Sequence, residues 1–255
     1  MAGDSQWEWK REGSITTMAA MTHAEIKDRM IWAGKVLVNE GQDDFTRGHI
    51  SFRLPDNPKL FFMKAHSLGL DEITPENILT IDLEGNVVAG TNRRHSEVYI
   101  HSEIFKVRPD VHCILHTHPT YSIAWSGTGR PLKPLSQPSA LFYNAVGIYK
   151  DTINLIRSKE MGAGVARDLG PHSVVMLKNH GIVTAAPTIE EVVIRTIMFE
   201  NAAQVQVLAE AAGDIAPEFP KADIEQLKHD ISRPDQFQVN FDYLVRRAKR
   251  REGKT

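Results

Sequence analysis

The segment 112–119, HCILHTHP, holds the residues best suited to chemistry, because two of its histidines form the pair His116-Thr117-His118. Side chains of a β-strand alternate between the two faces of a sheet, so His116 and His118 would share one face. Two neighbouring imidazoles can bind one metal ion, but two polar residues at the end of a strand would give the same pattern. Pro119 ends the expected strand and places the pair at a rim that solvent and substrate can reach.

A third candidate ligand is His180, in the segment LKNHGIV, where Gly181 permits a tight turn. Alone, His180 would be an ordinary turn residue. Together with His116 and His118 it makes a set of three histidines that leaves a coordination position open, which is typical of catalytic metal sites. His112 shares the face of the pair but lies at the start of the strand, so it is left out of the set.

Glu97 is the candidate acid or base, at the start of a predicted helix in HSEVYIH. In its ordinary role, a glutamate at this position stabilises the positive end of the helix dipole. His101 lies four residues later on the same helix face, where it would either orient Glu97 or pack beneath the site. The motif His-Glu-x-x-His, which places two histidines around a glutamate on one helix, is absent from the sequence, so the usual metalloprotease arrangement is excluded.

The composition limits the classes of function. The chain has 255 residues, of which 42% are hydrophobic, enough for one large core or two small domains. A formal net charge of −2 offers no field suited to nucleic acid. No run of about 18 apolar residues predicts a membrane span, and the first residues lack the pattern of a secretion signal. We therefore expect a small-molecule substrate.

Cys113 is the only cysteine, which excludes a disulfide within the chain and fits a reducing cytoplasm. On the predicted strand it lies on the face opposite His116, where it is most simply a small core residue. Apolar neighbours would raise the pKa of its thiol and weaken the alternative role of a nucleophile.

Helical and strand-like segments are interleaved along the chain. Helices are expected from Thr22 to Gly41 with a Thr22/Glu25 capping box, over 96–109, over 121–127, over 151–169, and from Thr188 to Gly213 with a second capping box to Glu191. Strands are expected at 49–55 and 59–65, in a hairpin at 78–90, at 111–119, and in a strand–turn–strand unit at 173–186. We predict a flexible arm over 1–20 and one α/β domain over 21–255, of which 214–255 is a C-terminal extension.

Several motifs together resemble the class II aldolase/adducin family. They are GHIS at 48–51, SE at 96–97, RPDVHCILHTHP at 108–119 and KNHG at 178–181. The resemblance covers roughly residues 22–213. It implies an α/β/α sandwich with a central, mainly antiparallel sheet, and a homotetramer with active sites between subunits.

The same resemblance assigns roles to the candidate residues. It implies that His116, His118 and His180 bind a divalent metal. It implies that Glu97 is the acid/base or a carboxylate close to the metal. The adducin branch of the family, which is not catalytic, tends to lose this set, so its presence favours an enzyme over an adducin-like binding module.

The family's chemistry is the breaking of a C–C bond while a metal holds adjacent substrate oxygens and stabilises the developing negative charge. One branch cleaves sugar phosphates, and another epimerises a sugar phosphate by reversing the cleavage on the other face. A third branch decarboxylates hydroxylated aromatic or pyridine dicarboxylates, such as 3-hydroxy-2-methylpyridine-4,5-dicarboxylate.

Departures from the aldolase pattern favour the decarboxylase branch. The family's asparagine before the first serine motif is His49 here, and the serine pair before the acidic residue is His95-Ser96, preceded by Arg93 and Arg94. The threonine-rich phosphate loop is replaced by KAHSLGLDEIT, which contains His66 and Ser67. Histidines and arginines suit planar carboxylates, which arginine binds through two parallel hydrogen bonds. Each arginine could equally be a solvated loop charge, and His66 a surface residue.

These residues predict a metal-dependent carbon–carbon lyase, most simply a decarboxylase of a hydroxylated dicarboxylate. The alternatives are an aldolase for a small hydroxy-keto or sugar-phosphate substrate and a non-catalytic binding module. Three histidines suit Zn²⁺, and the decarboxylase branch favours Mn²⁺. Tyr243, near the C-terminus, would donate a proton or close a neighbouring subunit's pocket, or it would simply pack on a terminal helix.

Overall fold

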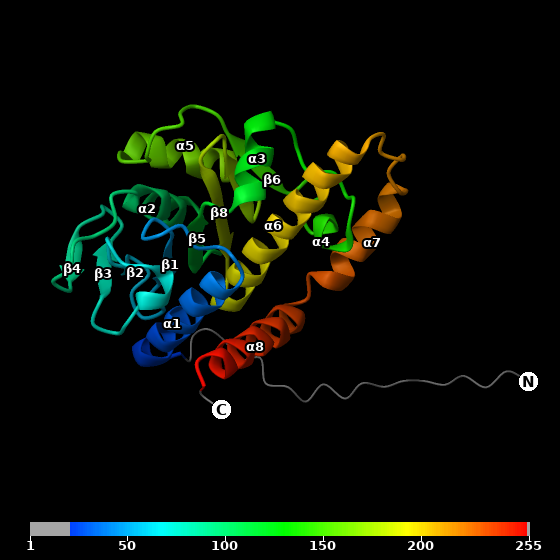
Figure 1. The fold of residues 1–255 in the computed structure, drawn as a ribbon. Helices are drawn as coiled ribbons and strands as arrows, with labels where there is room; N and C mark the ends of the chain where they lie inside the picture. Colours follow the sequence, from blue (N-terminus) through cyan, green and yellow to red (C-terminus); the bar gives the residue numbers. More distant parts are fainter. Residues whose placement is uncertain (1–20, 254–255) are drawn as a thin grey trace, which may run out of the picture.

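The computed structural model describes residues 21–253, whose strands form one eight-stranded sheet in the order β4-β3-β2-β1-β5-β8-β7-β6 (Figure 1). The strands are β1 (His49–Arg53), β2 (Leu60–Lys64), β3 (Ile78–Asp82), β4 (Val87–Ala89), β5 (Cys113–Thr117), β6 (Val146–Tyr149), β7 (Val174–Leu177) and β8 (Gly181–Ala186). All neighbouring pairs are antiparallel except β6 and β7. The expected α/β fold with a mainly antiparallel sheet is confirmed.

Helices cover both faces of this sheet. They are α1 (His23–Asn39), α2 (Val98–Val107), α3 (Thr120–Thr128), α4 (Gln137–Ala140), α5 (Lys159–Leu169), α6 (Ile189–Ala212), α7 (Lys221–Ile231) and α8 (Pro234–Arg251), with a short 3₁₀ helix η2 (Leu70–Glu72). One core cluster joins α1, α6 and α8 to one face of the sheet, and a second joins α2 and α5 to the other (Figure 1). The result is three layers, α/β/α.

Strand β5 shows how the sequence alternation places the site. Cys113 and Leu115 are buried in the core under α1, α6 and α8, whereas Ile114 is buried in the core under α2 and α5. His116 therefore faces the α2 side of the sheet. Burial raises the pKa of the Cys113 thiol, which supports its interpretation as a core residue.

Local sequence signals explain several element ends. Thr22 and Glu25 form the predicted capping box of α1. At α6 only half of the predicted box forms, because Thr188 accepts from the Glu191 backbone while the Glu191 carboxylate binds Arg195. Gly41, beyond the end of α1, adopts a positive φ of 71°.

Two expectations about the elements were wrong, and one strand was not expected. Helix α3 continues through Gly127 and ends at Thr128, because Gly129 supplies the left-handed C-cap. The segment 151–158 is irregular, and α5 begins only after Ser158, whose hydroxyl caps it. Strand β6 was missed, since its four residues carry no strong alternation.

The last part of the described chain, 214–253, contains α7 and α8. Helix α8 buries Phe237 and Phe241 in the core that α1 and α6 share. The predicted arm, 1–20, lies outside the described residues.

Candidate metal centre

Five residues from four segments of the chain converge at the α2 face of the sheet. In the antiparallel pair β1–β5, His49 lies directly opposite His116. His118 follows the end of β5, and His180 lies in the turn between β7 and β8. Glu97 is the N-cap residue of α2, but its side chain makes no capping hydrogen bond and is turned toward the histidines.

The turn that presents His180 depends on two unusual backbone positions. Asn179 has a positive φ of 60°, and the His180 backbone nitrogen donates to the Leu177 carbonyl at 3.0 Å. A Cβ at Gly181 would overlap the carbonyl oxygen of Thr117, so glycine is required where β8 approaches β5. The sequence NHG therefore brings His180 against the end of β5.

The structure brings together all four residues predicted for the metal set and its acid/base. One ligand atom from each of Glu97, His116, His118 and His180 lies within 4.8 Å of the others. The carboxylate of Glu97 places Oε1 3.7 Å from His180 Nε2 and Oε2 4.0 Å from His116 Nε2. The described residues thus contain a His₃Glu group in which a divalent metal fits.

The hydrogen bonds of these histidines leave nitrogen atoms free for a metal. His116 Nδ1 donates to the Ile182 carbonyl at 2.8 Å, so its buried Nε2 carries the lone pair and has no partner. Neither ring nitrogen of His180 has a hydrogen-bond partner. His118 Nδ1 lies 3.2 Å from Asp44 Oδ2, an ion-pair distance without good hydrogen-bond geometry. Buried polar atoms without partners are costly, and a metal ion would satisfy them.

Burial also sets the protonation states. It lowers the pKa of His118 to about 4 and lowers the pKa of His116 and His180 below the usual value for histidine. These imidazoles are therefore neutral at neutral pH, the form in which histidine binds metals. Burial raises the pKa of Glu97, although the backbone N–H of Ile156, donating to Oε1 at 2.9 Å, opposes this shift.

A second group of histidines adjoins Glu97 and His116. Ring centroids of His66 and His95 are 5.1 Å apart, those of His95 and His49 4.0 Å, and those of His49 and His116 5.0 Å. His49 Nε2 lies 3.8 Å from Glu97 Oε2. This row of imidazoles extends from the proposed metal position toward the loop at 65–69.

Two of the other predicted substrate residues have partners of their own. The Arg94 guanidinium stacks over Tyr99 at 5.5 Å and donates to the His95 carbonyl. Ser67, at a positive φ of 65°, accepts from or donates to His66 Nδ1 at 2.6 Å.

Arg93 and Ser96 are the remaining two. The Arg93 side chain is exposed, and its carbonyl accepts the His66 backbone N–H at 2.9 Å. Ser96 is partly buried between His95 and Glu97. Their part in substrate binding stays a prediction.

Tyr243 is not part of this cluster within one chain. It lies on α8, 47% exposed, with Arg247 over its ring at 5.9 Å. A role for Tyr243 at a neighbouring subunit stays a prediction.

Sequence reasoning missed several residues that contact the cluster. Asp44 comes from the loop before β1, where the run DDFTRGH offered only a weak signal. Ile156 donates a backbone N–H from an irregular segment 59 residues from Glu97, which no local pattern could reveal. Lys64 was read as part of a strand, yet it is fully buried, and its ammonium donates to the carbonyls of Thr46, Ala65 and Leu68.

The buried Lys64 has consequences for its neighbours. Burial lowers its pKa to about 8, so it remains charged at neutral pH. Its charge, second to burial, helps to lower the pKa of His95 to about 3. The positive charge therefore favours anions near His95 and keeps that imidazole neutral.

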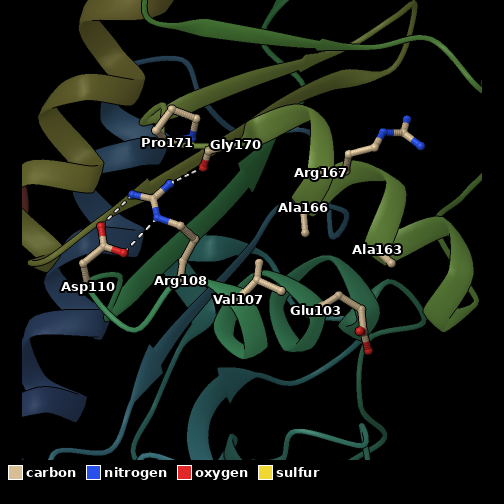
Figure 2. Close-up of a pocket in the computed structure, with 9 residues that line it drawn as sticks. All are labelled: Glu103, Val107, Arg108, Asp110, Ala163, Ala166, Arg167, Gly170 and Pro171. Carbon is tan, nitrogen blue, oxygen red and sulfur yellow. Dashed lines mark hydrogen bonds and ion pairs between the residues drawn. The ribbon is translucent and has the colours of Figure 1, made fainter.

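A separate hollow of about 660 Å³ lies between α2 and α5 (Figure 2). Its main charged groups are already paired: Arg108 binds both oxygens of Asp110 and the Gly170 carbonyl, and Arg167 binds Asp168. None of the predicted site residues lines it. With no unsatisfied buried group, this hollow is a weaker candidate for chemistry than the histidine cluster.

Comparison with known proteins agrees with this geometry. Residues 28–207 match the family model described as "Class II Aldolase and Adducin N-terminal domain", which is more than half of the 255 residues. The chain belongs to the class II aldolase and adducin family. The motifs that carried the resemblance, from GHIS to KNHG, lie within the matched range.

Individual relatives of this class II aldolase/adducin chain match over most of their length. It is 29% identical over 226 residues to the "Meiotically up-regulated gene 14 protein" of Schizosaccharomyces pombe, covering 86% of this chain and 88% of the relative. It is 27% identical over 222 residues to the 3,4-dihydroxyphthalate decarboxylase of Arthrobacter keyseri, covering 83% and 89%. The relatives therefore include a decarboxylase of a hydroxylated aromatic diacid.

A solved structure shows the same fold. The L-fuculose 1-phosphate aldolase from Glaciozyma antarctica PI12 superposes with a TM-score of 0.83 at 28% identity, covering 95% of each chain. Within 21–253, no helix has the length and apolar character needed to cross a bilayer.

Proposed function

We propose that this chain is a metal-dependent carbon–carbon lyase that decarboxylates a hydroxylated aromatic or pyridine dicarboxylate. The observation that carries the proposal is the position of the Glu97 carboxylate, which lies within 4.0 Å of ring nitrogens of the candidate ligands His116 and His180 and within 3.8 Å of His49 Nε2. A substrate bound at the metal would lie against an acid and a row of imidazoles at once.

The ligands of the metal would be His116, His118 and His180, with Glu97 beside them. The unpartnered buried nitrogens of His116 and His180 support this assignment. When bound, a divalent ion supplies a Lewis acid that holds adjacent substrate oxygens and stabilises the charge that develops as the C–C bond breaks. The donor set suits Mn²⁺ or Zn²⁺.

Glu97 would hold the proton and donate it to the product. In a decarboxylation the bond to the carboxylate breaks, carbon dioxide leaves, and the electron pair left on the ring carbon takes up a proton. A buried carboxyl whose pKa is raised can hold that proton and deliver it. The Ile156 N–H, bonded to Oε1, fixes which way the carboxyl group faces.

The row of histidines supports a substrate with a second anionic group. Sugar-phosphate aldolases of the family use hydroxyl and amide donors where this chain has His49 and His95. The charge of Lys64, buried nearby, adds a positive potential at His95. Imidazole N–H groups beside a buried ammonium suit the carboxylate of a dicarboxylate.

An aldolase is the second candidate, and the L-fuculose 1-phosphate aldolase fold match favours it. The two are separated by product. The purified chain, loaded with Mn²⁺ or Zn²⁺, should release carbon dioxide from 3,4-dihydroxyphthalate or from 3-hydroxy-2-methylpyridine-4,5-dicarboxylate. Aldehyde release from a sugar phosphate or hydroxy-keto acid, without carbon dioxide release, would favour the aldolase.

An adducin-like binding module is the third possibility. Such a module would purify without stoichiometric metal, and His116→Ala would leave its behaviour unchanged. Metal content measured on the purified chain therefore separates a module from either enzyme.

We further propose that residues 21–255 act as one domain with 214–255 as an extension, since one sheet carries every strand of the described residues. We also propose a cytoplasmic homotetramer whose active sites lie between subunits, where Tyr243 of one chain reaches the site of another. Size-exclusion chromatography with light scattering tests the assembly.

A further inference from the structure

A chain of buried hydrogen bonds leads away from the site into the interior of the protein. Ser51 Oγ and His101 Nδ1 are 2.6 Å apart, and His101 Nε2 and His49 Nδ1 are 2.6 Å apart. All three side chains are fully buried. At its outer end, His49 Nε2 lies 3.8 Å from Glu97 Oε2 and has no hydrogen-bond partner.

The arrangement follows from two sequence spacings. His49 and Ser51, two residues apart on β1, project from the same face of the sheet. Glu97 and His101, four residues apart at the start of α2, project from the same face of the helix. The helix lies over the strand, so that one imidazole of α2 contacts both polar side chains of β1.

Both imidazoles are fully buried, and burial disfavours the charged form of histidine, so both are neutral. A neutral imidazole has one N–H and one lone pair. The proton on either ring can therefore occupy only one of the two nitrogens, and the chain of bonds has only two consistent arrangements.

In the first arrangement, Ser51 donates its hydroxyl proton to His101 Nδ1, and His101 Nε2–H donates to His49 Nδ1. His49 then carries its own proton on Nε2, facing Glu97. Both hydrogen bonds of the Ser51–His101–His49 series then have a donor and an acceptor, and the His49 Nε2–H faces Glu97 Oε2 at 3.8 Å, beyond hydrogen-bond distance.

In the second arrangement all the protons are reversed, and two groups lose their partners. The Ser51 hydroxyl proton would have no acceptor, because His101 Nδ1 is the side-chain partner of Ser51 Oγ among residues 21–253. Whenever Glu97 is ionised, the bare lone pair of His49 Nε2 would also face a carboxylate. Buried donors without acceptors are disfavoured, so the first arrangement is the stable one.

We propose that Ser51 and His101 are positioning residues that hold His49 as the Nε2–H tautomer, which makes His49 a hydrogen-bond donor to an anionic oxygen and prevents it from binding a metal. His49, His95 and Glu97 bring ligand atoms within 4.8 Å of one another and could otherwise hold a second ion. The site therefore takes one metal per chain. In taking the anionic oxygen to be a substrate carboxylate, the inference rests on the proposed function.

The test reads the tautomer directly, without substrate. The full chain, labelled with ¹⁵N-histidine and loaded with Zn²⁺, is studied by NMR for the protonation of each ring nitrogen, and His49→Gln identifies the His49 signals. We expect His49 and His101 each to be protonated on Nε2 and bare on Nδ1, with one zinc per chain. A bare or zinc-bound His49 Nε2, or two zinc ions per chain, would overturn the proposal.

A matched pair of variants tests the positioning role. Ser51→Ala removes the hydroxyl donor and should leave His49 as a mixture of tautomers, whereas Ser51→Thr keeps the hydroxyl and the single tautomer. With the substrate that gives product, Ser51→Ala should lower kcat about 10- to 100-fold with zinc content unchanged, and Ser51→Thr should not. An unchanged His49 spectrum in Ser51→Ala contradicts the role, while a chain that releases no carbon dioxide contradicts the proposed function and leaves the tautomer result standing.

Discussion

The two groups of histidines beside Glu97 use the same residue type in opposite ways. Toward β5 and β8, His116 and His180 have buried ring nitrogens without partners, aimed at one point. Toward β1, His49 is tied through His101 to Ser51, and its remaining nitrogen faces a carboxylate. A histidine whose Nδ1–H donates to a carbonyl offers a lone pair on Nε2. A histidine whose Nδ1 accepts from a second imidazole offers a proton on Nε2.

The difference has a structural origin. Strand β8 supplies the Ile182 carbonyl that takes the Nδ1 proton of His116. For His49 on β1, the partner of Nδ1 is His101 of α2, which donates a proton to Nδ1 where the Ile182 carbonyl accepts one. We expect variants on the first side to lose the metal and variants on the second side to keep it.

The largest effect is expected from removing a ligand. His116→Ala or His180→Ala should abolish most metal binding and lower activity by about four orders of magnitude or more, because the Lewis acid carries the charge of the transition state. Metal analysis and steady-state kinetics of both variants check this. Full activity in both would end the metal hypothesis.

A smaller loss is expected when the proton carrier is replaced. Glu97→Gln should keep the metal but lower kcat about 10²- to 10⁴-fold, since the amide cannot transfer a proton. Metal content measured beside kcat decides the role. If the metal is lost with the activity, Glu97 is a ligand rather than the acid.

A change on the β1 side should be milder still. His49→Gln removes one donor to an anionic oxygen, which should raise KM or lower kcat about 10- to 100-fold while metal content stays at one per chain. His95→Gln is the companion variant, because His95 lies beside His49 without the bonded chain behind it. Equal losses of activity in the two variants would contradict the role proposed for Ser51 and His101.

Acid should destabilise the metal-free protein through buried histidines of both groups. The folded pKa is about 4 for His118 and about 3 for His95 and His101, against 6.5 for an ordinary histidine. As pH falls below about 6.5, the unfolded chain binds protons first, so the free energy of unfolding falls until the folded histidines also titrate. Urea titrations from pH 7 to pH 4 should show a steady loss, and a flat profile would contradict the buried neutral histidines.

The smallest effect is expected at the hollow between α2 and α5. Arg167 lies on an exposed face and pairs with Asp168 and Asp151. Arg167→Ala should change neither metal content nor kcat, as screened surface pairs contribute little. A clear fall in activity would indicate that this hollow, and not the histidine cluster, is the active site.

Much of the site could be predicted because strand alternation and helix spacing are local. The pair His116 and His118, the turn at His180, and the start of α2 at Glu97 all follow from patterns within a few residues. Contacts made by distant or irregular backbone could not be predicted. The Ile156 N–H, the Asp44 carboxylate and the burial of Lys64 depend on how loops cross the sheet.

The fold shows the same division. Strongly periodic segments such as α1 and the unit β7–β8 were predicted within a few residues, and the capping box located the start of α1. The irregular segment 151–158 was predicted as helix, because no local pattern reveals that its Ile156 N–H bonds to the distant Glu97 carboxylate. The parallel strand β6 depends on pairing with β7, a tertiary interaction that short sequence patterns do not encode.

The most direct test of the account compares metal content in two matched variants, His116→Ala and His49→Gln, whose residues face each other across the β1–β5 pair. Both remove a fully buried imidazole next to Glu97. Inductively coupled plasma mass spectrometry should find about one metal per chain in the unsubstituted protein and in His49→Gln, and almost none in His116→Ala. Equal metal content in the two variants would contradict the division of the site into a metal side and a donor side.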